Sequence, residues 1–185
     1  MSDKRIEKTV QLIEDSFFDL YQTIPLEKIS ITKICRQANI NRSTFYYHYV
    51  DYPAFLAHLE KTIVNEYLAI QNQYNYDTDT EKIVSDTLSY LIEHKEKSQF
   101  LFREGSNGTG PNLIKSFLRE KSMPIWLKES TISQSEFHLI FTYFINGTFS
   151  LLEYYFNHPN LDKDTVLNTM DQVIKYGVYN FIYTI

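Results

Sequence analysis

The stretch that decides the fold is Ser30–Tyr49, which reads SITKICRQANINRSTFYYHY. Ser30 is a residue type that caps helix N-termini, so it predicts a short helix that ends before Asn39. Asn39 tolerates the left-handed conformation that follows many helices, and Asn41 is placed to cap another short helix over about 42–47. Two short helices joined by so tight a turn predict a helix-turn-helix.

Two helices so joined must cross closely, and Cys35 is small enough to lie at the crossing. The apolar residues whose offsets point back toward a preceding helix are Ile34, Ala38, Ile40 and Phe45. The second short helix then has an outer face of hydroxyl, guanidinium and imidazole groups, formed by Arg42, Ser43, Thr44, Tyr46, Tyr47 and His48. Such groups contact phosphates and base edges in DNA. The alternative interpretation is a pair of ordinary core helices with a solvated outer face. The crowding of tyrosines between 46 and 52 argues against it.

Helices are expected on both sides of this segment, because only five Gly and five Pro interrupt the chain and no alternating strand pattern persists. The expected fold is all-α, with about nine helices. A three-helix DNA-binding head covers residues 1–52, and a long fourth helix over about 51–73 connects it to a larger helical domain covering 53–185. The clearest loop is Gly105–Pro111.

The net charge of −5 is unusual for a protein that binds nucleic acid, but the charge is unevenly distributed. Residues 1–56 contain seven basic and seven acidic residues, whereas residues 57–185 contain eleven and sixteen. Residues 28–50 contain Lys28, Lys33, Arg36 and Arg42 and no acid. This local basic patch suits a phosphate backbone.

Composition also excludes several classes of protein. Cys35 is the sole cysteine, which rules out an intrachain disulfide and favours a reducing compartment. No signal-peptide core or apolar run of membrane-spanning length is present, so a cytoplasmic protein without membrane contact is expected. We find no nucleophile elbow, paired catalytic acids or metal-ligand cluster. An enzyme is therefore not expected, nor is a metal or cofactor.

Residues 34–56 read ICRQANINRSTFYYHYVDYPAFL. This segment resembles the head of the tetracycline-repressor-like (TetR) family, whose pattern is approximately I-A-x-x-A-G-V-S-x-x-T-x-Y-x-Y-F-x-x-K-x-x-L. The resemblance covers about the first third of the chain. Three positions depart from the family pattern: Asn39 replaces a glycine, Asn41 replaces a capping serine, and Tyr52 replaces a lysine that binds phosphate.

The resemblance implies roles for individual residues in binding double-stranded DNA. Thr44 and His48 would contact phosphates, while Arg42, Ser43 and Tyr46 would enter the major groove, with Arg42 reading a guanine. Tyr47 would lie against the backbone or thymine methyl groups. Phosphate contacts from the preceding helix would come from Ser30, Thr32 and Lys33. At Tyr52 the hydroxyl would donate to a phosphate in place of the missing lysine.

Two long apolar helices end the chain, one opening at Ser133 and the other at Asp162. Both are apolar on more than one side, and both carry a mid-helix glycine, Gly147 and Gly177, which costs about 1 kcal/mol relative to alanine. Close packing between helices is one compensation. We therefore expect the two helices to pair with their symmetry mates in a homodimer. The alternative is that they fill the core of a single subunit.

The family's second domain also holds a small-molecule inducer. The candidate pocket residues are aromatic, and each is also a candidate for ordinary core: Tyr90, Phe100, Phe102, Phe117, Trp126, Phe141 and Tyr143. The region from His94 to Trp126 is also similar to a TetR subgroup that includes a dihydroxyacetone-kinase operon activator, which works through a protein coactivator. The expected function is thus a ligand-responsive repressor that binds a pseudo-palindromic operator. The alternative is a TetR-like activator or interaction module whose second domain binds a protein coregulator.

Overall fold

The computed structural model describes residues 2–75, 80–103 and 109–182, and every regular element in these ranges is helical. The expected all-α fold is therefore confirmed for this part of the chain. The chain forms two compact units, Met1–Thr62 and Ile63–Ile185. Their boundary lies inside helix α4 (Tyr52–Gln71), whereas the boundary expected from the sequence lies at the start of this helix.

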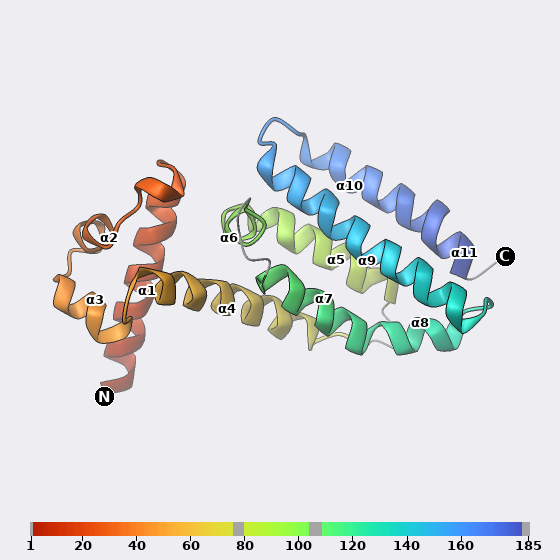
Figure 1. Ribbon diagram of the computed structural model, residues 1–185, viewed down its shortest axis with the longest axis horizontal. Coiled ribbons are helices and arrows are strands. Elements are labelled where there is room, and N and C mark those ends of the chain that lie inside the picture. Colours follow the sequence, from red (N-terminus) through yellow and green to blue (C-terminus); the bar gives the residue numbers. More distant parts are fainter. Residues whose placement is uncertain (1, 76–79, 104–108, 183–185) are drawn as a thin grey trace. The chain divides into compact units, whose positions relative to one another are not determined.

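Unit 1 is a small helical head in which two short helices follow one long one (Figure 1). Its elements before α4 are α1 (Ser2–Tyr21), the 3-10 turn η1 (Leu26–Lys28), α2 (Ile31–Gln37) and α3 (Arg42–His48). The side chains of Phe17, Phe45 and Phe55 are fully buried at its centre. The ring centroid of Phe55 lies 5.4 Å from that of Phe17 and 5.4 Å from that of Phe45. Edge-to-face pairs of this kind add about 0.5–1.5 kcal/mol each beyond area burial.

The start of α2 and its connection to α3 follow the expected local chemistry. The Ser30 hydroxyl accepts a hydrogen bond from the Lys33 N–H at 3.4 Å, which caps α2. Asn39 has a φ of 51°, the left-handed conformation that lets the chain turn at once into α3. Asn41 occupies the N-cap position of α3, as expected, but its side chain makes no capping hydrogen bond.

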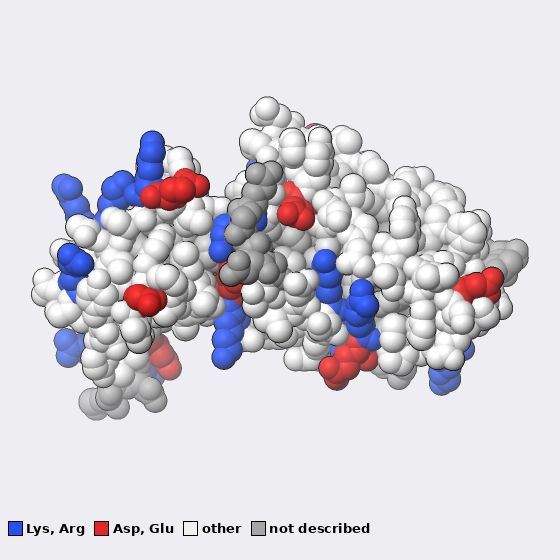
Figure 2. All heavy atoms as spheres, in the orientation of Figure 1, with Lys and Arg blue, Asp and Glu red and all other residues white. Residues whose placement is uncertain are grey.

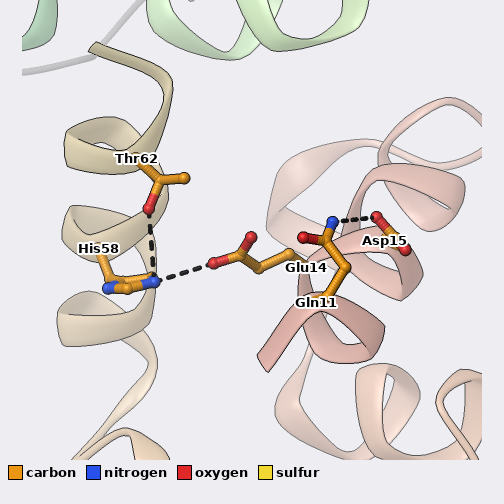
Figure 3. A network of polar contacts seen from close by, with 5 residues as sticks. All are labelled: Gln11, Glu14, Asp15, His58 and Thr62. Atoms are coloured by element: carbon orange, nitrogen blue, oxygen red, sulfur yellow. Dashed lines mark hydrogen bonds and ion pairs between the residues drawn. The ribbon is translucent and has the colours of Figure 1, made fainter. Parts of the chain in front are cut away.

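A polar clasp, formed by Glu14 of α1 with His58 and Thr62 of α4, lies at the edge of the core of unit 1 (Figure 3). His58 Nε2 lies 2.9 Å from Glu14 Oε1 and 3.4 Å from Thr62 Oγ1. The Glu14 side chain is 10% exposed and that of His58 41%. The Glu14 carboxylate is thus largely removed from water, and the imidazole replaces part of its hydration.

Replacing His58 with alanine is expected to lower the free energy of unfolding of unit 1 by roughly 1 kcal/mol. A hydrogen bond to a charged group contributes about 1.5–3 kcal/mol, and the exposure of His58 reduces that value. A double-mutant cycle with Glu14→Gln, followed by chemical denaturation, measures the coupling. The pair Gln11 and Asp15 on the same helix is a matched control, since their 2.8 Å hydrogen bond is exposed. Equal coupling free energies in both cycles would show that the clasp stabilises unit 1 no more than an exposed hydrogen bond does.

Unit 2 is an all-helical bundle, in which α9 runs beside α10 and above α5 and α7 in Figure 1. Its helices after α4 are α5 (Thr80–Glu93), α6 (Lys95–Leu101), α7 (Thr109–Lys121), α8 (Met123–Glu129), α9 (Gln134–Asn157), α10 (Lys163–Gln172) and α11 (Asn180–Ile182). Helix α8 was not expected from the sequence. Helix α7 begins within the expected Gly105–Pro111 loop, of which residues 105–108 lie outside the described part of the chain.

The N-terminal ends of α9 and α10 are defined by the expected caps. Ser133 and Glu136 form a complete capping box, in which each side chain bonds the backbone N–H of the other residue. The hydrogen bonds from Ser133 lower the pKa of Glu136, which keeps its carboxylate ionised at the helix start. Asp162 caps α10 by accepting the Thr165 N–H at 2.8 Å. The long helices of unit 2 are therefore delimited by local sequence chemistry.

The last helix changes its winding before it ends. Between α10 and α11 the segment Val173–Tyr179 (η2) is π-helical, with i→i+5 hydrogen bonds and more residues per turn. The buried side chains of this helix are spaced every four residues, at Met170, Ile174, Val178 and Ile182. Beyond η2, the carbonyl of Ile182 accepts the backbone N–H of Thr131 at 3.0 Å, which ties the helix end to the segment before α9.

Candidate nucleic-acid interface

Helix α3 presents polar and aromatic side chains outward and one aromatic side chain inward. Phe45 is fully buried, and it anchors the helix to the core of unit 1. The outward set expected from the sequence divides by exposure: Arg42, Ser43, Tyr46 and Tyr47 are exposed, whereas Thr44 and His48 are partly buried. Tyr47, at 75% exposed, is a large ring with little protein contact. Water-exposed aromatic surface of this size suits a partner that stacks on it or packs against it.

Arg42 and Tyr46 contact one another on this outer face. Arg42 Nη2 donates to the Tyr46 hydroxyl at 3.3 Å, and the guanidinium carbon lies 5.8 Å from the centre of the Tyr46 ring. The hydrogen bond raises the pKa of Arg42 further above its already high value. Because the residues are one turn apart, the ring limits the rotamers of the guanidinium. The pair thus presents an oriented five-donor group, which suits bidentate contact with a guanine.

The candidate residues of α2 lie at its exposed N-terminal end. Ser30, Thr32 and Lys33 are all exposed. The Lys33 ammonium donates to the backbone carbonyl of Lys28 at 2.8 Å, so it is held near the start of the helix. A lysine has two further protons to donate, which leaves this ammonium able to reach an anion.

Two of the clustered tyrosines do not belong to the outer face. Tyr49 is buried, its hydroxyl has no hydrogen-bond partner, and burial together with the charge of Glu14 raises its pKa. Tyr52 was expected to donate to a phosphate, but its hydroxyl oxygen is buried as well. Its ring lies 6.3 Å from that of Phe55, which draws the side chain toward the core. In this structure Tyr52 does not replace the missing lysine.

Basic side chains gather on the α2–α3 part of unit 1. Figure 2 shows Lys and Arg over this region, with some Asp and Glu on the same face of the unit. The residues from 28 to 50 contribute four positive charges and no negative charge. Unit 1 also has a polar cleft of about 460 Å³, to which α1 contributes Arg5 and Thr9, and α2 contributes Arg36. No expectation included Arg5 and Thr9, because no local pattern links the start of α1 to α2.

Unit 2 has a second surface feature, an apolar groove of about 460 Å³ between α9 and the last helix. Its lining residues carry no charge, and they are Tyr143, Phe144, Gly147, Thr148, Ser150, Leu151, Tyr154, Met170, Val173, Ile174 and Val178. Large apolar side chains flank it in solvent, including Leu139, Tyr176 and Phe181. A methyl group added at Gly147 or Gly177 would meet no atom within 4 Å. Packing within one subunit therefore does not explain either glycine.

The seven aromatic residues proposed for an inducer pocket are divided among different surroundings. Phe100, Phe102, Trp126 and Phe141 are buried, and Tyr90 and Phe117 are partly buried. The Phe102 ring packs on Phe149 and Phe156, near the end of α9. The Trp126 ring packs on Phe141 and Phe144, nearer the start of that helix. Tyr143 is 70% exposed and lines the apolar groove, apart from the buried members of the set.

Comparison with known proteins supports the fold. The chain matches no protein-family model and no curated protein sequence. Among solved structures it is similar to the dihydroxyacetone kinase operon activator DhaS, with a TM-score of 0.68 and 19% identity over 94% of this chain and 98% of the other. It is also similar to a TetR transcriptional regulator from Streptococcus agalactiae 2603V, with a TM-score of 0.64 and 17% identity over 94% and 97%. The protein has a TetR-like, all-α fold.

Among residues 2–75, 80–103 and 109–182, no group of three His, Cys, Asp or Glu side chains is arranged to hold a metal ion. None of the helices described combines the length and the apolar character that crossing a membrane requires.

Proposed function

We propose that the protein is a sequence-specific DNA-binding transcriptional regulator that binds a pseudo-palindromic operator as a homodimer. The observation that carries this proposal is the outer face of α3, where the oriented Arg42–Tyr46 pair and the exposed Tyr47 ring stand in a region without acidic residues. A helix of this kind reads base edges in the major groove, while the preceding helix contacts the backbone. Both structural neighbours are described as an operon activator or a transcriptional regulator, which agrees with this function.

The dimer is supported by the surface of unit 2. The apolar groove is lined without charge, and α9 and the last helix also expose large apolar side chains, so a second copy could cover apolar surface that would otherwise face water. The open space at Gly147 and Gly177 suits the close approach of helices from a second copy. In such a dimer the two heads would enter successive major grooves about 34–36 Å apart.

We further propose that a small molecule controls DNA binding as an inducer releases a repressor. A ligand that favours one conformation of the dimer would shift the spacing of the heads and so change operator affinity. Helix α4 supports this proposal, since it begins in unit 1 and ends in unit 2 without a break.

An activator that binds a protein coregulator is the second candidate, favoured by the similarity to DhaS and by the uncharged apolar groove. A reporter gene placed behind a selected operator distinguishes the two functions. Deleting this protein's gene raises expression if it represses and lowers expression if it activates. A stoichiometric protein that co-purifies with it favours the coregulator.

Replacing Arg42 with alanine is expected to weaken binding to a selected operator by about 1–3 kcal/mol and to relax base preference at one position of each half-site. The operator is first obtained by selecting bound duplexes from a random pool, and affinity is then measured by mobility shift. Arg119→Ala is the control, because it removes one exposed arginine from unit 2. If Arg42→Ala and Tyr46→Ala both left operator affinity unchanged, the assignment of α3 as the recognition helix would be wrong.

A further inference from the structure

The polar cleft of unit 1 is built from three separate segments of the head. Arg5 comes from the start of α1, Arg36 from the end of α2, and Asn39 and Asn41 from the turn before α3. All four side chains are exposed. Cys35, which also lines the cleft, is buried, and its desolvation raises the pKa of the thiol, so that no negative charge arises there. The cleft is therefore a concave surface with two cations and two amides around it.

The charges of the cleft are not balanced within the protein. No carboxylate is among its lining residues, and with the residues that the structure describes neither guanidinium forms an ion pair. Two like charges facing one cavity repel each other unless an anion lies between them. Two arginines without a carboxylate partner are unusual in a protein whose net charge is −5. An anion would remove this repulsion.

The remaining polar groups narrow the choice of anion. Asn41 makes no capping hydrogen bond, so its amide N–H groups remain able to donate to an anion. The Thr9 hydroxyl donates to the carbonyl of Arg5 at 2.9 Å and is therefore not an anion donor. Planar guanidinium groups and amides together match the tetrahedral oxygens of a phosphate, which accepts several charge-assisted hydrogen bonds at once.

We propose that the polar cleft binds one phosphate group, held between the guanidinium groups of Arg5 and Arg36 with a further hydrogen bond from Asn41. The phosphate belongs either to the DNA backbone or to a free phosphate-bearing molecule. The backbone source rests on the proposed function, and Thr44 supports it, since this residue lines the cleft and also belongs to the outer face of α3. A phosphate bound here would lie beside the recognition helix and fix its register on the duplex.

The experiment uses the full-length protein and the variants Arg5→Gln, Arg36→Gln and the double variant. Lys8→Gln is the control, because Lys8 is an exposed cation of α1 that does not line the cleft. The first probe is a short mixed-sequence duplex, whose affinity is measured over a series of salt concentrations. The second probe is inorganic phosphate, titrated while NMR follows the arginine Nε–H signals and the backbone amides of 39–41.

If the cleft holds one backbone phosphate, the double variant reduces the magnitude of the slope of log affinity against log salt by roughly 0.9, and each single variant reduces it by no more than that. Two separate phosphates would instead give a loss in the double variant of about twice this size. If the slopes do not change but inorganic phosphate shifts the cleft signals of the wild-type protein and not of the double variant, the site takes a free phosphate. Unchanged slopes together with no phosphate response would overturn the proposal, as would an equal loss of slope in Lys8→Gln.

The same experiment distinguishes failure of the proposed DNA binding from failure of the phosphate site. A wild-type protein that ignores every duplex at low salt would contradict DNA binding, and the phosphate titration would then decide the cleft alone. If the protein selects an operator through Arg42 but all three cleft variants behave as wild type, the proposed function stands and the phosphate site does not.

Discussion

Replacing Phe45 with alanine is expected to unfold the head while unit 2 stays folded. Phe45 is fully buried, and its ring centroid lies 5.3 Å from that of Tyr49 and 5.4 Å from that of Phe55. Removing such a ring costs about 3–5 kcal/mol, through lost burial and through the cavity that remains. A unit of this small size has about that much stability in total. Hydrogen exchange should show lost protection in α1–α3, with α9 still protected.

Tyr47→Ala is the matched control for this prediction. It removes an aromatic ring of similar size from the same helix, but the ring is exposed and its loss leaves no cavity. Both variants should lose DNA affinity, and only Phe45→Ala should lose exchange protection in the head. Retained protection in Phe45→Ala would mean that α3 is not anchored through this side chain.

Replacing Gly147 with leucine is expected to convert the proposed homodimer to monomers without unfolding the subunit. The space beside Gly147 is open within one subunit, so that the fold itself has room for a larger side chain. In a dimer that brings α9 close to a second copy, overpacking costs about 1–3 kcal/mol at each symmetry-related contact. The combined cost corresponds to a loss of dimer affinity of roughly 30-fold or more. Sedimentation velocity over a protein concentration series measures this change.

The control for the interface is Thr142→Leu, because Thr142 is exposed on α9 but does not line the apolar groove. This variant should dimerise like the wild type, and neither substitution should lower the melting temperature of the monomer, because leucine is a better helix former than glycine or threonine. If Gly147→Leu remained dimeric at every concentration, the apolar groove would not be the site of self-association. A wild-type protein that is monomeric at micromolar concentration would contradict the dimer itself.

The helix-turn-helix could be predicted from sequence because short-range chemistry determines it. The cap at Ser30 and the left-handed Asn39 depend on residues within a few positions of each other, and both are confirmed. The same is true of the capping box at Ser133. The orientation of individual side chains could not be predicted in the same way. Asn41 stands at the N-cap of α3 without a capping hydrogen bond from its side chain, and the Tyr52 hydroxyl oxygen is buried.

Features that depend on tertiary packing were beyond the reach of sequence patterns. Helix α8 was not expected, and Pro124 lies in its first turn, where a missing N–H has no cost. The aromatic residues of unit 2 could be recognised as apolar from the sequence. Which of them pack against which part of α9 could not be predicted. The cleft between Arg5 and Arg36 joins residues far apart in the chain, and only the folded head brings them together.

The π-helical segment Val173–Tyr179 makes the last helix sensitive to its length. In an ordinary α-helix each residue adds a rotation of about 100°, so side chains spaced by four residues drift around the axis. The wider turns of η2 counter this drift and keep Ile174, Val178 and Ile182 against the bundle. Deleting a single residue there would let the segment rewind as ordinary α-helix, because eleven residues at about 100° each also complete close to three turns between Met170 and Ile182. Inserting a further residue would instead swing Phe181 and its neighbours toward other faces, so homologous chains should tolerate one residue fewer in this segment but not one more.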